Sequence, residues 1–235
     1  MAVSSGRLRM MMIGPMLLLV LVACQPPPGG SATALTYQGI CGLEQGQIGS
    51  MDEQGVLQWI EEHHGTPLPL EVPDLGEGMP GGTLAAYGWD QPDGRARGIA
   101  YLHDGRLVSL SFRDLEHGPT FGQVVAGLGS PEAVYRTMLR YEQVLYRVGL
   151  DYPALGISVQ TSGIEDWQTL GGDEGGPRIT LTETMPVTDI ECFQPGALKQ
   201  TLHENLFWPD DIVSSYLQRQ IPWPGFGETV PLDTK

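Results

Sequence analysis

The stretch RGIAYLHDGRLVSLSFR, residues 97–113, decides the fold more than any other part of the chain. Its two ends are rich in β-branched, aromatic and leucine side chains, and the Asp104-Gly105 pair between them favours a two-residue type I′ turn. The stretch therefore predicts a β-hairpin of strands 97–103 and 106–113 with one apolar face. The predicted cross-strand pairs are Tyr101 with Val108 and Ile99 with Leu110.

A predicted helix start lies on each side of this hairpin. Ser50 and Glu53 have the spacing of a capping box, and apolar residues follow them until a Gly-Thr-Pro stop at 65–67. Thr120 and Gln123 repeat that spacing ahead of a Gly-Ser-Pro stop. Further strands are predicted at 84–89, 143–148, 157–161, 178–183 and 187–193, and further helices at 197–205 and 212–220.

The order of these elements, a capped helix followed by antiparallel strands, recurs after about 65–70 residues. We therefore expect an α+β fold of two tandem helix-plus-antiparallel-sheet units with C-terminal helices. The first unit is placed at residues 35–116 and the second at 117–193. Residues 194–235 would hold the C-terminal helices and a rigid aromatic tail, Trp223–Phe226.

The N-terminus has the composition of a secretory signal peptide. Arg7 and Arg9 precede an apolar run at 10–22 that ends in small residues. As a helix this run would span about 20 Å, less than the roughly 30 Å of a bilayer core, which weighs against an uncleaved transmembrane helix.

The end of that run, Leu21-Val22-Ala23-Cys24, resembles the lipobox of bacterial lipoproteins. In that family the cysteine receives a diacylglyceryl thioether and becomes the first residue of the mature chain. The resemblance implies a removed signal peptide at 1–23, acyl chains on Cys24, and a Pro/Gly/Ser tether over 24–34. A plain signal peptide followed by a structural cysteine is the alternative.

The charge of the chain disfavours nucleic acid as a partner. Removal of residues 1–23 would leave 11 Lys and Arg (13 less Arg7 and Arg9) against 28 Asp and Glu, a formal charge of −17. Such a surface repels phosphates and anionic lipid head groups, so the membrane would be reached through the acyl chains on Cys24. We expect a lipid-anchored protein at the extracytoplasmic face of a bacterial membrane.

Cys24 is one of three cysteines, which leaves Cys41 and Cys192 as an even pair. An exported chain meets an oxidising compartment, and the pair is therefore predicted to form a disulfide. Two buried free thiols are the alternative.

The second capped helix carries a further resemblance. The pattern Thr120-x-x-Gln123-Val124-x-x-x-Leu128-Gly129-x-Pro131 is similar to the opening helix of the SmpA/OmlA-type (BamE-like) lipoproteins. Those domains share a helix-plus-antiparallel-sheet fold with the β-lactamase inhibitor protein, which contains two such units in tandem. The doubled pattern and the C-terminal helices of this chain depart from the single-unit lipoproteins. The resemblance implies a lipid-anchored binding scaffold and does not imply barrel assembly.

No catalytic or metal-binding motif emerges from the sequence. Glu61-Glu62-His63-His64 lacks a third metal ligand nearby, and the helix starting at His203-Glu204 has Phe207 where a zinc protease needs its second histidine. A calcium site in the acidic glycine loop at 171–176 has too few oxygens. We expect no catalytic residue, no metal and no cofactor.

Together these features predict a lipid-anchored extracytoplasmic binding or envelope scaffold protein without catalytic activity. Its partner would be an envelope protein or component, bound on the sheet's solvent face or the Trp223–Phe226 tail. The alternative is a lipid-anchored cell-envelope hydrolase that uses a carboxylate pair. A pocket lined by two facing carboxylates, or by His103 or His117 beside a carboxylate, would favour that alternative.

Overall fold

The computed structural model describes residues 35–72, 82–90, 97–140, 143–171, 176–196 and 210–233. The predicted signal peptide, the tether and Cys24 lie outside the described residues, as do the predicted helix at 197–205 and most of the acidic glycine loop. Residues Ala34–Lys235 form one compact unit. The described residues contain no candidate for a membrane-spanning helix.

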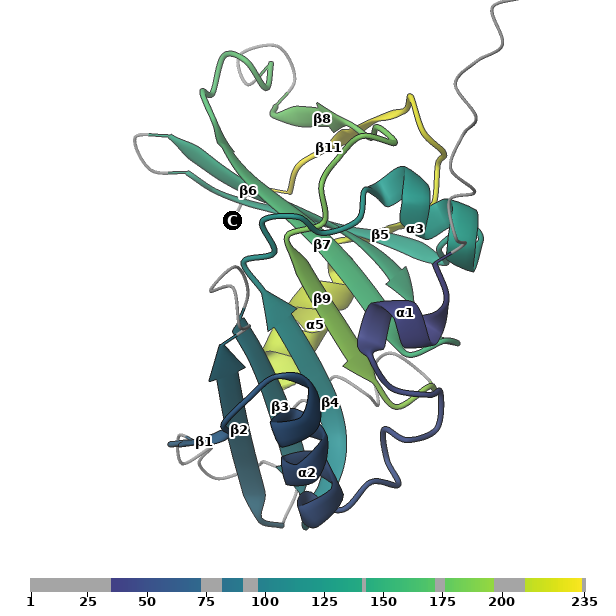
Figure 1. Cartoon of the computed structure of the whole chain (residues 1–235). Coiled ribbons are helices and arrows are strands. Elements are labelled where there is room, and N and C mark those ends of the chain that lie inside the picture. The colour runs from purple at the N-terminus through teal and green to yellow at the C-terminus, as the bar shows by residue number, and fades with distance from the viewer. Residues whose placement is uncertain are drawn as a thin grey trace, which may run out of the picture. The chain divides into compact units, whose positions relative to one another are not determined.

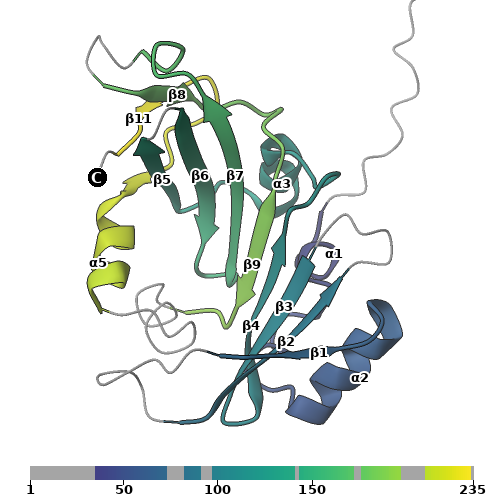
Figure 2. The same cartoon turned by 90° about the vertical axis from the view of Figure 1, so that its left-hand side faces the viewer.

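A nine-stranded antiparallel sheet organises this unit (Figures 1 and 2). Its strands follow the order β1-β2-β3-β4-β9-β7-β6-β5-β10. The bounds are β1 Leu68–Leu70, β2 Leu84–Asp90, β3 Arg97–His103, β4 Arg106–Arg113, β5 Ala133–Arg140, β6 Val144–Tyr152, β7 Ile157–Glu165, β9 Asp189–Phe193 and β10 Gln220–Pro222. A two-stranded sheet pairs β8, Arg178–Thr180, with β11, Thr229–Pro231.

Helices lie on both sides of the large sheet. Helices α1 (Tyr37–Cys41), α2 (Glu53–His63) and α3 (Phe121–Leu128) lie on one side, and α5 (Asp210–Gln218) lies on the other (Figures 1 and 2). We call these sides the α1–α3 face and the α5 face. The main apolar core lies on the α1–α3 face and includes Val56, Ile60, Leu102, Leu110, Phe121, Val148, Leu150, Ile157, Val159 and Cys192, all nearly or fully buried.

The expected fold class, α+β with two tandem helix-plus-sheet units, is wrong. One large antiparallel sheet dominates the structure, and helices are few. The reason lies in β9, which pairs with β4 on one edge and with β7 on the other, so the strands of both halves belong to one hydrogen-bonded sheet. One apolar cluster likewise includes residues from both halves. The domain boundaries at 116/117 and 193/194 stay predictions.

The 97–113 hairpin forms as predicted, but its register differs. Asp104 and Gly105 both have positive φ, as a type I′ turn requires. Tyr101 pairs with Ser109 instead of Val108, because the register shifts between Tyr101 and Leu102. Because of this bulge, Ser109 and Ser111 of β4 lie on the same side of the sheet as Ile99 and Tyr101 of β3, the α5 face, whereas Leu107 lies on the α1–α3 face. The apolar residues buried on the α1–α3 face are Ala100, Leu102, Leu107, Leu110 and Phe112.

Of the two predicted capping boxes, the one at Thr120 forms and the one at Ser50 does not. The capping box at Thr120 is confirmed, since its side chain accepts from the Gln123 amide at 3.3 Å and the Gln123 side chain accepts from the Thr120 amide at 2.8 Å. The box at Ser50 is wrong: Asp52 is the N-cap of α2 and accepts from the Gly55 amide at 2.9 Å. The Ser50 hydroxyl instead donates to the Gly46 carbonyl.

Candidate functional site

A buried carboxylate joins α5 to the sheet. Asp151, on β6, has no exposed surface. Its Oδ1 accepts from the hydroxyls of Ser158 at 2.6 Å and Tyr216 at 2.8 Å, and its Oδ2 accepts from the Gln220 side-chain amide at 2.7 Å. These donors come from β7, α5 and β10. One side chain thus connects three elements that are far apart in the sequence.

The same contact positions two aromatic rings. Tyr216 stacks on Tyr135 of β5, with ring centroids 4.2 Å apart and planes at 11°. Together with Val213 they form a small apolar cluster on the α5 face that is separate from the main core. The Asp151 hydrogen bonds therefore fix α5 over β5 and β6.

Burial sets the acid–base properties of this contact. Burial raises the pKa of Asp151, although its three hydrogen-bond donors act in the opposite direction. The Tyr216 hydroxyl also has a raised pKa, chiefly from burial and then from the adjacent carboxylate. The tyrosine therefore stays a hydrogen-bond donor at neutral pH.

Beside this contact, strands β5, β6 and β7 carry a hollow of about 300 Å³ on the α5 face. We call it the β5–β7 hollow. It is lined by Tyr135, Thr137, Leu139, Leu145, Tyr146, Arg147, Ser162 and Arg219.

Two cross-strand rows lie in and beside the hollow, and all their members except Ile164 line it. Thr137, Arg147 and Ser162 face one another across β5, β6 and β7, and two residues further along each strand lie Leu139, Leu145 and Ile164. The rows are about 7 Å apart, at two residues of strand rise. The first row is polar and cationic and the second is aliphatic. Leu139, Leu145 and Ile164 are 48%, 40% and 61% exposed.

Arg219, which follows the last turn of α5, brings a second guanidinium to the hollow. Its Nη1 donates to Thr137 Oγ1 at 3.1 Å. Neither Arg147 nor Arg219 has a carboxylate within ion-pair distance in the part of the chain that the structure describes. Among the described residues, no acidic side chain lines the hollow. The arrangement suits an anion with an aliphatic part.

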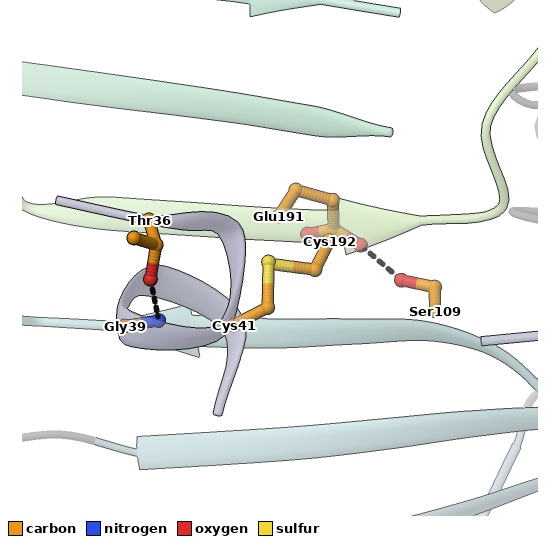
Figure 3. Close-up of a disulfide and its surroundings, with 6 residues drawn as sticks. All are labelled: Thr36, Gly39, Cys41, Ser109, Glu191 and Cys192. Carbon is orange, nitrogen blue, oxygen red and sulfur yellow. Dashed lines mark hydrogen bonds between the residues drawn. A yellow bond between two sulfur atoms is a disulfide. The ribbon is translucent and has the colours of Figure 1, made fainter. Parts of the chain in front are cut away.

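A second carboxylate lies on the same face, one strand beyond β7. Glu191 of β9 accepts from the Ser109 hydroxyl of β4, as Figure 3 shows. Burial raises the pKa of Glu191, and the hydroxyls of Ser109 and Ser111 and the charge of Arg113 lower it. Ser158 pairs with both Asp151 and Glu191, so the Cα atoms of the two acidic residues stand two strand spacings apart, about 10 Å.

These carboxylates do not form the facing pair in a pocket that the hydrolase alternative requires. Neither Asp151 nor Glu191 lines the β5–β7 hollow or the second hollow, an open one of about 770 Å³ at Glu132, Pro153, Pro195 and Gln220. Glu132 is the one carboxylate of that second hollow among the described residues, and it accepts from the Ala154 amide at 3.2 Å.

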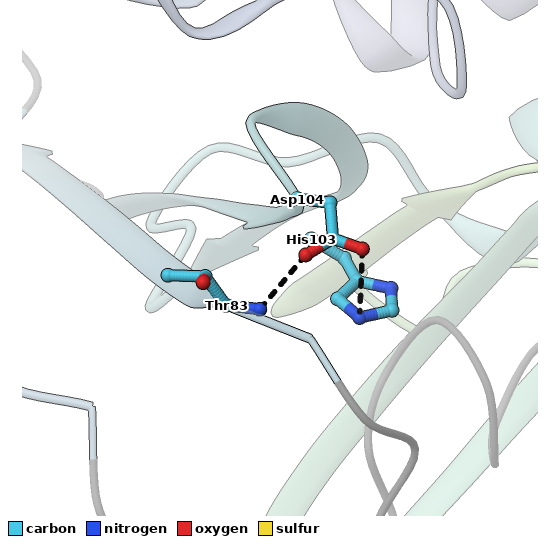
Figure 4. Close-up of polar contacts among 3 residues, drawn as sticks. All are labelled: Thr83, His103 and Asp104. Carbon is cyan, nitrogen blue, oxygen red and sulfur yellow. Dashed lines mark hydrogen bonds and ion pairs between the residues drawn. The ribbon is translucent and has the colours of Figure 1, made fainter.

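His103 does lie beside a carboxylate. Its Nε2 is 3.8 Å from Asp104 Oδ2, and Asp104 Oδ1 accepts from the Thr83 amide at 2.9 Å (Figure 4). The pair sits at the tight turn between β3 and β4, and Asp104 there joins the turn to the start of β2. Neither described hollow includes the pair. The contact between His103 and Asp104 is therefore explained by the turn.

His117 lies in the loop before α3 and makes no hydrogen bond or ion pair with the described residues.

The histidines at the end of α2 belong to an aromatic cluster. The His64 ring stacks on Trp89 at 5.0 Å and meets Trp59 edge-on at 4.7 Å. Burial, followed by the charge of His63, lowers the pKa of His64 to about 4. His63 places its Nδ1 2.9 Å from the Trp59 carbonyl. Among the described residues no group of three metal-ligating side chains comes together.

The other site residues named from the sequence have these positions. Cys41 and Cys192 form a disulfide that ties α1 to β9, on the face opposite Glu191 (Figure 3). The tail residues Trp223 and Phe226 are partly buried against the main core, with rings in edge contact at 5.0 Å. Cys24 is outside the described residues, and its lipidation stays a prediction.

Sequence reasoning missed the residues that define the hollow. Strand β5 was not predicted, and Arg147, Arg219 and Asp151 were not singled out. A usable signal was the near-absence of acidic residues in 133–150, where one Glu accompanies three Arg in a chain with 28 acids and 13 bases.

Comparison with known proteins adds no assignment, since no protein family, no curated protein and no solved structure matches this chain.

Proposed function

We propose that this chain is a lipid-anchored extracytoplasmic binding protein without a catalytic role, which binds an envelope component on the α5 face of its sheet. The observation that supports this proposal most is the exposed row Leu139, Leu145 and Ile164 beside the β5–β7 hollow. Three large aliphatic side chains in one exposed cross-strand row are typical of a binding surface.

The alternative surface, the Trp223–Phe226 tail, is less suited to binding. Its two rings pack on the core and on each other, which leaves less apolar area for a partner. The hydrolase alternative has no supporting pocket among the described residues.

The anchor is tested by metabolic labelling with a palmitate analogue. We expect label on the native chain and none on Cys24→Ala, with Cys24 as the new N-terminus by intact mass. An unlabelled native chain would contradict the anchored location.

The binding face is tested by site-specific photo-crosslinking in the producing cell. A photoreactive residue at Leu145 should give a discrete adduct, and the same residue at Gln54, exposed on α2 of the opposite face, should not. Adding Ile164→Asp should remove the Leu145 adduct, because the charge disrupts the aliphatic row. Equal adducts from both faces, or none from Leu145, would overturn the proposed face.

A further inference from the structure

The β5–β7 hollow carries charge and apolar surface in a fixed order. Arg147 stands between Thr137 and Ser162 in the cationic row, and the aliphatic row begins about 7 Å further along the strands. A ligand that satisfies both rows must be anionic at one end and aliphatic at the other. A volume of about 300 Å³ is at the small end of ligand sites, so it fits a single chain.

The two arginines have the geometry to hold one anionic head group. Arg219 is oriented by its hydrogen bond to Thr137, which is the direct cross-strand partner of Arg147. Both arginine side chains therefore line the hollow at the position of this threonine. A guanidinium presents a planar fork of donors that matches the two oxygens of a carboxylate.

The net charge of the whole chain favours a small anion over a large one as the ligand. With a formal net charge of −15, the protein repels an acidic protein surface or an anionic bilayer over the whole approach. A ligand with a single negative charge meets little of that repulsion and is attracted by two nearby guanidiniums. The charge pattern therefore favours a small amphiphile over an acidic macromolecule.

We infer that the β5–β7 hollow is a binding site for a single-chain aliphatic carboxylate, with its head group at Arg147 and Arg219 and its chain along Leu139, Leu145 and Ile164. This inference rests on the proposed function, for which it names the class of ligand and the residues that select it.

The positioning of Arg219 depends on the buried contact next to the hollow. Arg219 follows α5 directly, and α5 is fixed over the sheet by the hydrogen bonds from Tyr216 to Asp151. Tyr135, which stacks on Tyr216, also lines the hollow. Asp151 is thus a positioning residue for the site and does not itself touch the hollow.

The test is calorimetric titration of the purified full chain with decanoate, decanol and decyltrimethylammonium. Decanoate should bind at least about tenfold more tightly than either of the other two, the difference expected when a charge-assisted hydrogen bond is lost. Shortening the ligand to hexanoate should weaken binding, by up to about tenfold for each two methylenes removed. Equal binding of decanoate and decanol would overturn the inference.

Matched variants assign the binding to the hollow. The pair Arg147→Gln with Arg219→Gln should weaken decanoate binding about tenfold or more, and the pair Arg147→Lys with Arg219→Lys should keep most of it. The control pair Arg97→Gln with Arg178→Gln makes the same charge change at exposed sites away from the hollow and should bind as the native chain does. Equal weakening by the control pair would overturn the site assignment.

Thermal unfolding of each variant shows whether it folds, and the Lys pair keeps the site testable if the Gln pair does not. The results also separate the two proposals. If decanoate does not bind but the Leu145 crosslink and its loss with Ile164→Asp are observed, the α5 face binds a macromolecule, and the carboxylate inference alone is overturned. If neither is observed, the proposed function falls with it.

Discussion

Leu150 and Asp151 are neighbours on β6 and are equally buried, yet they face opposite sides of the sheet and stabilise it by different physics. Leu150 belongs to the large apolar core under α1–α3, where burial of area is the main contribution. Asp151 faces α5, where the apolar cluster is small and the carboxylate accepts from three donors, of which Tyr216 belongs to the helix. The α1–α3 face mainly stabilises the fold, and the polar contacts of the α5 face mainly position helix α5.

The largest expected effect lies on the α1–α3 face. Replacing both Cys41 and Cys192 with Ala removes a disulfide that closes a sequence separation of 151 residues. Chain entropy alone predicts a loss of about 5 kcal/mol for a loop of that length, and real losses are often smaller, about 2–5 kcal/mol.

Urea unfolding at pH 7 measures this effect, with fluorescence of the tryptophans as the probe. The native chain with and without reductant gives a second comparison that involves no substitution. An unchanged urea midpoint in the double variant would mean that the apolar core of this face is sufficient without the covalent link.

A smaller loss is expected from the α5 face. Asp151→Ala removes the acceptor of Ser158, Tyr216 and Gln220 at once and leaves buried donors without it. We expect the free energy of unfolding to fall by about 2–3 kcal/mol, in the range measured for unsatisfied buried polar groups. Tyr216→Phe, which keeps the ring stack on Tyr135, should cost about half as much.

The comparison of the two variants separates hydrogen bonding from packing. If Asp151→Ala and Leu150→Ala lowered stability equally while Tyr216→Phe had no effect, the carboxylate would act as a space-filling group. The contrast between the faces would then be lost.

The two faces also differ in how well the sequence predicts them. The hairpin at 97–113 and the Thr120 capping box are local patterns, and the structure confirms both elements. The bulge after Tyr101 changes the register, and β4 also pairs with β9, some 80 residues later, so that both sides of β4 are buried. Local patterns cannot contain that information.

The α5 face depends on contacts that no local pattern shows. Asp151 lies 65 residues before Tyr216 and 69 before Gln220, and within its own segment it looks like the polar end of a strand. Strand β5 was missed because Arg136 and Thr137 interrupt its apolar alternation. The hollow needs β5, β6, β7 and α5 together, so it becomes visible only in three dimensions.

The pH dependence of stability is a third, smaller effect that distinguishes the α5 face from the α1–α3 face. Burial raises the pKa of Asp151 in the folded chain above its ordinary value of 3.8, so the folded state binds this proton more tightly than the unfolded state does. The contribution of Asp151 to stability is therefore greatest below about pH 4 and is lost as the pH rises through the folded pKa. Asp151→Asn does not titrate and lacks this dependence.

We expect the free energy of unfolding of the native chain, minus that of Asp151→Asn, to increase as the pH is lowered from 7 toward 4. The difference cancels the contribution of Glu191, whose pKa is also raised and which both chains contain. A difference that stayed flat or decreased on acidification would mean that Asp151 is not protonated more readily in the folded chain.

The smallest effects test the helix starts on the α1–α3 face. Asp52→Ala removes the acceptor of the Gly55 amide, and Thr120→Ala removes the acceptor of the Gln123 amide. Each should lower the free energy of unfolding by about 1 kcal/mol, the usual cost of losing an N-cap, and each should cost less than Asp151→Ala. Ser50→Ala is the control, since its hydroxyl does not cap α2 and its loss should cost less than that of Asp52. If an exposed cap on this face cost as much as the buried carboxylate on the other, polar contacts would matter equally on both sides of the sheet. Such a result would contradict the proposed difference between the faces, in which the α1–α3 face stabilises by burial and the α5 face positions by hydrogen bonding.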